Sequence, residues 1–350
     1  MRVSGVRLAG VAALGALLLG GCSVGSAAPS GTLGSSARGG ATATTLDLVA
    51  FSVPKAADGA LEAAWAKTPD GEGVTWTESY GASGDQSRAV ASGLHADFVH
   101  FSLESDVTRL VDAGLVAEDW NAGPTAGIVS CSVVVLVVRP GNPKNIAGWD
   151  DLIKDGVQVI TPNPGSSGSA RWNILAAWGS AIADGGTEAE AETYISNLFR
   201  NVVALPGSSR DATSAFLSGT GDVLVSYENE AILAKQNGEA LDYVVPDITL
   251  RIDNPGAVLM GAKPQAEAWL DYILSPAGQA IYAQFGFRPV IDGVAIGSVN
   301  GANDPKNPFP APEQLLTIAD FGGWPTASAK FFDPDTGIIS KIQVATGKSS

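Results

Sequence analysis

The stretch that decides the fold reads Thr161-Pro-Asn-Pro-Gly-Ser-Ser-Gly-Ser-Ala-Arg-Trp-Asn-Ile-Leu-Ala-Ala-Trp-Gly179. The β-branched run at 157–160 predicts a strand, which the two prolines end. Apolar residues then recur at helical spacing, so a helix follows the small polar residues at 165–169. A strand, a Ser/Gly turn and a helix start together point free backbone N–H groups at an anion. An ordinary helix capped by Ser167 explains the same pattern.

The same pattern occurs twice more in the chain. Tyr80-Gly-Ala-Ser-Gly-Asp-Gln86 lies between an expected strand at 74–76 and a helix that runs to Leu94. Gly207-Ser-Ser-Arg-Asp-Ala-Thr213 follows an expected strand at 202–205 and opens another helix. Three such junctions make an anion pocket if they converge. The sequence alone does not show whether they converge.

Strands alternate with helices along most of the chain, which predicts an α/β fold with mostly parallel sheets. No internal repeat is evident. The other expected strands are at 46–51, 96–101, 128–138, 222–226 and 258–260, and the other expected helices at 57–65, 106–113, 149–153, 188–199 and 265–285.

The chain of 350 residues carries a formal charge of −15. This acidity argues against nucleic acid or anionic lipid as a partner, because both require a basic surface. The length after the leader is enough for two lobes of ordinary domain size. A small anion held by local backbone dipoles remains compatible with the charge.

Residues 1–21 have the features of a secretory signal peptide: arginines at the start, an apolar run at 8–19 and small residues before a cysteine. Leu19-Gly-Gly-Cys22 resembles the lipobox of bacterial lipoproteins, which implies cleavage before Cys22 and a lipid on its sulfur. A secreted protein without a lipid is the alternative. The Gly/Ser/Ala/Thr-rich segment 22–44 is then a flexible tether. Cys131 is expected to be a free, buried thiol.

The stretch at 161–179 closely resembles the periplasmic sulfate-binding proteins of ABC transporters, whose motif reads TPNP-x-SSGGARWN-x-LAAWG. The resemblance extends over about 46–342. It implies a two-lobed α/β periplasmic-binding-protein fold, with a mostly parallel sheet in each lobe and the ligand in the cleft between the lobes. The expected divisions are 45–126 plus about 250–300 for lobe 1, 127–249 for lobe 2, and 301–350 for a C-terminal tail that packs across both.

The resemblance also implies which residues bind sulfate. Ser83 matches the serine whose hydroxyl contacts the ligand, and Tyr227 stands where the family has a tryptophan whose indole N–H binds it. Asp106 and Arg171 match charged residues that lie behind the backbone amides and are expected to compensate each other. The positions that match amide donors are Val53, Ser167, Gly168, Ser169 and Ser209, of which Ser169 replaces a glycine.

A site built only from donors suits sulfate, since every lone pair of a buried dianion must be answered. Phosphate keeps a proton at neutral pH and requires an acceptor, so such a site rejects it. Such a site requires that the nearby acids Asp85 and Asp211, in the first turns of two of these helices, face water. The implied function is a lipid-anchored extracytoplasmic solute-binding protein that captures sulfate for an ABC importer. It implies binding to permease subunits, a monomer, and no catalysis, cofactor or metal.

Several other functions fit parts of the sequence. Thiosulfate, molybdate, tungstate or phosphate are alternative ligands of the same fold, and the leader alone permits a cell-envelope sensor or adhesion lipoprotein. A hydrolase is disfavoured, because Gly165-Ser-Ser-Gly-Ser169 lacks the last glycine of a nucleophile elbow. The two histidines, His95 and His100, flank a strand and are expected to be structural. Gly347-Lys348-Ser349 lacks the preceding glycine of a phosphate-binding loop.

Overall fold

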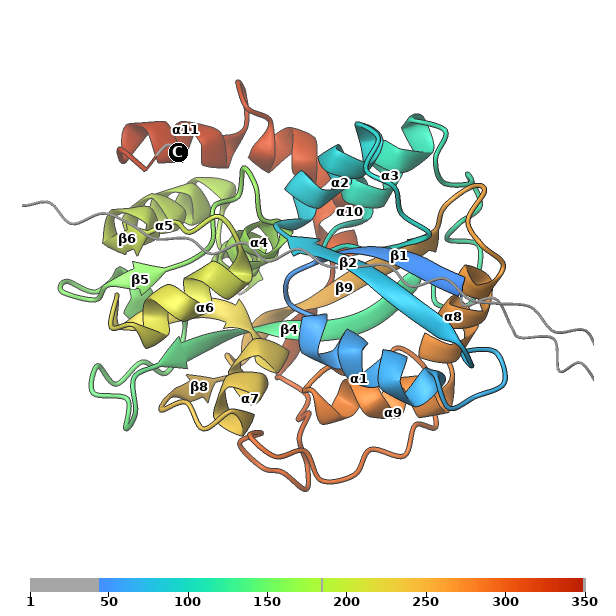
Figure 1. Ribbon diagram of the computed structural model, residues 1–350. Coiled ribbons are helices and arrows are strands. Elements are labelled where there is room, and N and C mark those ends of the chain that lie inside the picture. Colours follow the sequence, from blue (N-terminus) through green and yellow to red (C-terminus); the bar gives the residue numbers. More distant parts are fainter. Residues whose placement is uncertain (1–43, 184, 349–350) are drawn as a thin grey trace, which may run out of the picture. The chain divides into compact units, whose positions relative to one another are not determined.

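The computed structural model of the protein describes residues 44–183 and 185–348 (Figure 1). The expected signal peptide, the lipidation site at Cys22 and all of the expected tether except Thr44 lie outside these residues. Thr44 is already the first residue of a strand. Within the described part, none of the helices combines the length and the apolar content that crossing a bilayer requires.

The centre of the described part is a mixed sheet with the strand order β2-β1-β3-β9-β4-β7-β5-β6, to which β10 is added beside β9 and β8 beside β4. The strands that flank the centre pair in parallel, whereas β9 is antiparallel to β3, and β4 is antiparallel to β7, β8 and β9. The expectation of a mostly parallel sheet was therefore wrong at the centre. The strands are β1 (Thr44–Phe51), β2 (Val74–Gly81), β3 (Phe98–His100), β4 (Ile128–Val138), β5 (Val159–Ile160), β6 (Val202–Ala204), β7 (Val223–Tyr227), β8 (Asp242–Val244), β9 (Ile248–Val258) and β10 (Gln314–Leu316).

Two strands of eleven residues, β4 and β9, run through the middle of the sheet (Figure 1). The sequence predicted β4 with its observed bounds, because it is a continuous β-branched run that is buried almost throughout. It missed nearly all of β9. Pro255 lies opposite Ile128, next to the point where the register shifts, and Gly256 leaves no room for a side chain against Phe98 and Val129.

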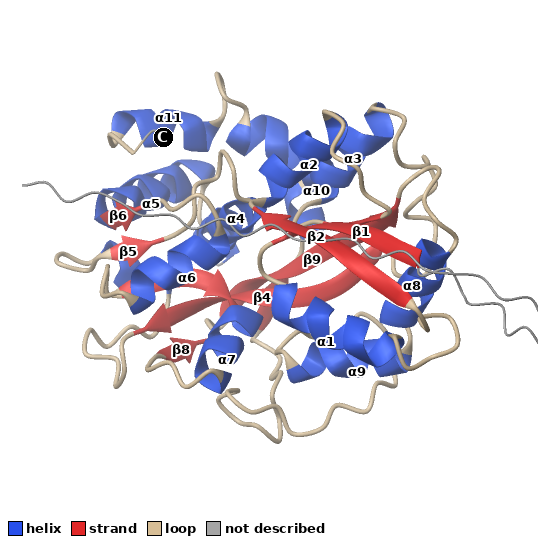
Figure 2. Cartoon of the chain, in the orientation of Figure 1, coloured by secondary structure: helices blue, strands red, loops and turns tan. Residues whose placement is uncertain are grey.

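Helices lie on both sides of this sheet (Figure 2). Each expected helix is present within a few residues, with two changes. The segment Trp149–Ile153 is a short 3₁₀ helix. The segment 265–285 forms two helices, because Pro276 begins the second and the Ser275 hydroxyl caps it by accepting from the Gly278 N–H (3.1 Å). The helices are α1 (Lys55–Trp65), α2 (Ser83–Ala91), α3 (Glu104–Asp112), α4 (Gly168–Ala183), α5 (Glu188–Asn201), α6 (Ser209–Leu217), α7 (Glu228–Gln236), α8 (Gln265–Ile273), α9 (Pro276–Gln284), α10 (Gly323–Ala327) and α11 (Ile338–Ala345).

The core is formed by apolar side chains between the sheet and the helices. Trp65 and Trp76 each pack edge to face against Trp269 where α1 and α8 meet β2, and their own rings are tilted against each other. The three ring centroids are 4.8–5.9 Å apart. Cys131 on β4 is a free, buried thiol, as expected, and burial raises its pKa. The starts of α2, α4 and α6 carry the candidate site.

Candidate functional site

Several backbone N–H groups at or next to helix starts have no hydrogen-bond acceptor. The first N–H groups of a helix have no partner within it, so something else must satisfy them. Among the described residues, no backbone carbonyl accepts from five such groups. They belong to Val53, Ser83, Gly168, Ser169 and Ser209.

These residues are buried, which makes the missing acceptors costly. Val53, Ser83, Ser169 and Ser209 are each at most 3% exposed, and Gly168 is buried as well. A buried donor without a partner costs about 1–3 kcal/mol. Five such groups together indicate a ligand that accepts hydrogen bonds.

The structure brings the junctions that carry these groups together. The N–H of Gly84 in α2 donates to the Ser166 carbonyl before α4 (3.2 Å). Arg210 in α6 donates to the Val53 carbonyl before α1 (3.3 Å). A cavity of about 890 Å³ is lined by Ser52, Ala82 and Ser208, each of which directly precedes a residue with a free N–H. The convergence that the sequence left open is therefore present.

The hydroxyl of Ser83, which was expected to contact the ligand, is hydrogen-bonded within the protein. It donates to Asp106 Oδ2 (2.6 Å) and accepts from the Ser102 N–H (2.9 Å), so its single proton is already used. What Ser83 offers a ligand is its backbone N–H.

Ser167 shows the reverse arrangement. Its N–H donates to the Asn163 carbonyl (2.8 Å), although an amide donor was expected at this position. The side chains of Asn163 and Ser166 in the same turn bond within the protein. No described residue is hydrogen-bonded to the Ser167 hydroxyl, which leaves that hydroxyl for a ligand.

Gly168 is required by close packing. A Cβ at this position would lie 2.7 Å from Cβ and Oγ of Ser102 and 2.7 Å from Cγ of Leu103. Only glycine lets the start of α4 approach the segment before α3 so closely. At the next position, Ser169 is accommodated with 2% exposure in place of the family's glycine.

Tyr227 lies at the end of β7 and is completely buried. Its hydroxyl is 2.8 Å from Oγ of Ser102, and burial raises its pKa. Tyr227 therefore lies among the candidate site residues, but its hydroxyl is hydrogen-bonded to Ser102 within the protein. The sequence analysis missed Ser102, because a lone serine after a strand, without a neighbouring glycine, carries no signal.

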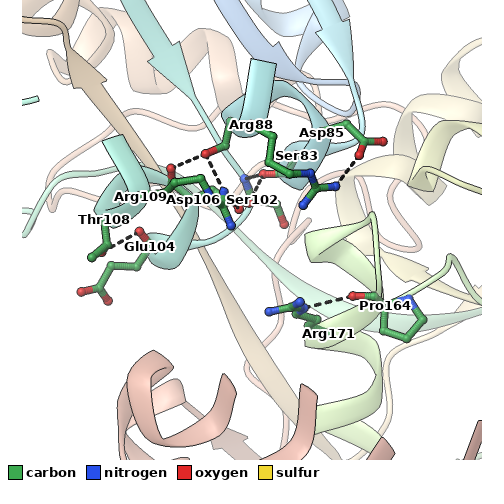
Figure 3. A network of polar contacts seen from close by, with 11 residues as sticks. Ser83, Asp85, Arg88, Ser102, Glu104, Asp106, Thr108, Arg109, Pro164 and Arg171 are labelled. Atoms are coloured by element: carbon green, nitrogen blue, oxygen red, sulfur yellow. Dashed lines mark hydrogen bonds and ion pairs between the residues drawn. The ribbon is translucent and has the colours of Figure 1, made fainter. Parts of the chain in front are cut away.

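Figure 3 shows the charged residues behind the starts of α2 and α4. Asp106 forms an ion pair with Arg109 (3.0 Å), and no ion pair within 4.0 Å joins it to Arg171 in the described structure. Arg171 instead donates to the Pro164 carbonyl (3.1 Å), and its guanidinium lies over the Phe332 ring. Burial lowers the pKa of Arg171, and the charge of Asp106 opposes that shift. The expected compensation of Arg171 by Asp106 is therefore indirect, and Arg109 is the direct partner.

Carboxylates near the site are either paired or exposed. Glu228 accepts from Arg288 (2.7 Å), and Glu230 accepts from Arg210 (2.8 Å). Asp85 and Asp211 are exposed, but both also line the cavity, where Asp85 pairs with Arg88 and Asp211 accepts from the Ser208 hydroxyl (2.8 Å). The carboxylates at the site are therefore each engaged by a donor of the protein, whereas the groups without partners are N–H and O–H donors.

One group of potential metal ligands lies outside this site. Oxygen and nitrogen atoms of Asp47, His95 and Asp97 lie within 4.8 Å of one another. The Lys263 ammonium is 2.7 Å from Asp97 and 3.5 Å from Asp47. The Lys263 ammonium therefore supplies the positive charge that a metal ion would otherwise bring to these carboxylates.

Comparisons with known proteins show the family and the fold of the chain. Residues 46–288 match the family described as bacterial extracellular solute-binding protein. A sulfate-binding protein from Synechococcus elongatus is 40% identical over 333 residues, 91% of this chain and 92% of that protein. A thiosulfate-binding protein from Pseudomonas aeruginosa is 39% identical over 64% of this chain and 70% of its own length. The structure of the sulfate-binding protein SubI from Mycobacterium tuberculosis matches with a TM-score of 0.78 and 44% identity, over 83% of this chain and 100% of that one. These matches confirm the resemblance inferred from the sequence.

The pairing of Glu228 predicts a pH-dependent stability. Burial raises the pKa of Glu228, and Arg288 opposes that rise. Arg288→Met leaves the buried carboxylate without its cation, so we expect a loss of about 3–5 kcal/mol in unfolding free energy at neutral pH. The loss should shrink as the pH falls, since a group whose folded pKa is raised is better tolerated in its protonated form. Urea denaturation at several pH values measures it.

Arg251→Met is the matched control for this prediction. Arg251 is half-exposed and pairs with Asp253 (2.8 Å), so its loss should cost about 0–1 kcal/mol. Equal and pH-independent losses in the two variants would show that Glu228 does not depend on Arg288.

Proposed function

The chain belongs to the bacterial extracellular solute-binding protein family, and we propose that it captures sulfate outside the cell membrane and delivers it to an ABC importer. Like its family, the protein binds a solute and is not an enzyme. The observation that carries the choice of ligand is the set of buried N–H groups without acceptors. Donors at helix starts stabilise an anion without a counter-cation in contact with it.

The groups proposed to bind sulfate come from four junctions. The Ser167 hydroxyl adds a donor from the side chain, and Tyr227 lies behind the site with its hydroxyl on Ser102. Arg171 and Asp106 balance charge behind the amides without touching the ligand. The proposed N–H donors are those of Val53, Ser83, Gly168, Ser169 and Ser209.

Pairing of the nearby carboxylates favours sulfate over phosphate. Phosphate carries a proton at neutral pH, and that proton needs an acceptor. Asp106 and Glu230 accept from Ser83, Arg109, Arg210 and Thr213 instead. Asp85 and Asp211, which line the cavity, accept from Arg88 and Ser208. With every carboxylate engaged in this way, the phosphate proton faces donors, and sites with such unmatched polar groups discriminate strongly.

Thiosulfate is the main alternative ligand, because one relative is a thiosulfate-binding protein. Tyr227, which replaces the family's tryptophan, changes the shape of the site and also keeps molybdate, tungstate and phosphate as candidates. A sensor or adhesion role for a lipoprotein is a weaker alternative, since it does not explain the buried N–H groups.

We further propose that the chain forms two lobes that close on the ligand, with 45–126 and about 250–300 in the first, 127–249 in the second and 301–350 packed across both. The contact of Gly84 with Ser166 and the contact of Arg210 with Val53 would then join the two lobes. In this proposal β4 and β9 are the connections about which the lobes turn.

The sequence around Cys22 supports a lipid anchor on the outer face of the cell membrane. A single anchored monomer that presents both lobes to the permease subunits fits this role. The acidic charge of the chain makes additional binding to anionic lipid unfavourable.

Titration calorimetry tests the proposed ligand. We expect the purified chain without its leader to bind one sulfate ion per protein at neutral pH, and phosphate to give no binding heat. Thiosulfate and molybdate should be titrated in parallel. Stronger binding of either would identify a different oxyanion as the ligand, and no binding of any of the four would contradict the proposed function.

Gly168→Ala tests the proposed site. The added Cβ would clash with Ser102 and separate the start of α4 from the rest of the site, so we expect at least about a tenfold loss in sulfate affinity. Gly123→Ala is the matched control, because a Cβ there meets no atom within 4 Å and Gly123 does not line the cavity. Wild-type affinity in a folded Gly168→Ala protein would exclude Gly168 from the site.

A further inference from the structure

We propose that Ser102 is a positioning residue that holds the separate parts of the sulfate site in register and slows release of the ion. This inference rests on the proposed function, because it concerns the same site. Ser102 lies between β3 and α3, is 1% exposed and was not among the residues that the sequence indicated. Its backbone and its side chain contact different parts of the site, and each set of contacts supports the proposal.

The backbone of Ser102 is hydrogen-bonded on both sides. Its N–H donates to the Ser83 hydroxyl (2.9 Å), at the start of α2. Its carbonyl accepts from the indole N–H of Trp172 in α4 (2.8 Å) and from the Asn254 amide in β9 (3.2 Å). One peptide segment thus fixes the start of α2 relative to α4.

The side chain of Ser102 makes the other two contacts. Its Oγ is 2.8 Å from the Tyr227 hydroxyl, at the end of β7. Its Cβ and Oγ fill the space that a side chain at position 168 would require. Ser102 therefore touches three of the segments proposed to surround the ion: those of Ser83, Gly168 and Tyr227.

These contacts determine where the free N–H groups lie. Ser83 and Gly168 contribute N–H donors from two different helices, α2 and α4. The distance between these two donors therefore depends on Ser102, which contacts both residues. If the lobes part to release sulfate, the bonds of Ser102 to Trp172 and Tyr227 must break in the same step. Removing the hydroxyl bond should then speed dissociation and leave association nearly unchanged, because the open state does not contain that bond.

A double-mutant cycle with kinetics tests this inference. Stopped-flow mixing with sulfate can follow the intrinsic tryptophan fluorescence, to which Trp172 contributes as one of eight tryptophans. Its ring packs against Trp324 with centroids 4.6 Å apart. Ser102→Ala and Tyr227→Phe each remove one partner of the same hydrogen bond. We expect each to raise the dissociation rate constant about tenfold, with the association rate constant within twofold of wild type. The double variant should match the single variants, because the bond is lost only once.

Controls separate this role from a general loss of stability. Ser92→Ala replaces an exposed serine just after α2 and should leave both rate constants unchanged. Thermal unfolding identifies a variant that fails to fold, in which case the other single variant carries the test. Unchanged dissociation in both folded variants, or fully additive effects in the double variant, would overturn the role of Ser102 while sulfate binding by the wild type stands. Absence of sulfate binding by the wild type would overturn this inference together with the proposed function.

Discussion

The structure depends on one constraint: buried hydrogen-bond donors must find acceptors. Within residues 44–183 and 185–348, the N–H groups of Val53, Ser83, Gly168, Ser169 and Ser209 have no acceptor, although each residue is buried. Such an arrangement is stable only if a ligand or ordered water completes it. The sheet, the glycine at 168 and the position of Ser102 all serve to bring these helix starts together.

The same constraint explains how an acidic protein binds an anion. The formal charge of −15 would repel sulfate if carboxylates faced the site. Instead, arginines pair with three of the buried carboxylates: Arg109 with Asp106, Arg210 with Glu230 and Arg288 with Glu228. These three arginines neutralise buried acids, so the ligand is bound by neutral donors whose dipoles point into the site.

Much of this could be predicted from the sequence, because strand–turn–helix patterns are local. The three junctions and the buried run of β4 were found where the structure has them. β9 was missed since its Pro255 and Gly256 fit only through a register shift and close packing against other strands. Ser102 and the true partner of Asp106 were missed for a related reason: hydrogen-bond partners distant in the chain leave no pattern along it. The sequence also does not show which hydroxyl proton is already used within the protein, as that of Ser83 is.

The most direct test of this account is an NMR titration of the ¹⁵N-labelled chain with sulfate. The account predicts that the amide protons of Val53, Ser83, Gly168, Ser169 and Ser209 shift downfield together and saturate at one ion per protein, as expected for hydrogen bonds to a charged acceptor. Shifts confined to arginine and lysine side chains, with these five amides unmoved, would contradict it, because the anion would then be held by charge and not by the backbone.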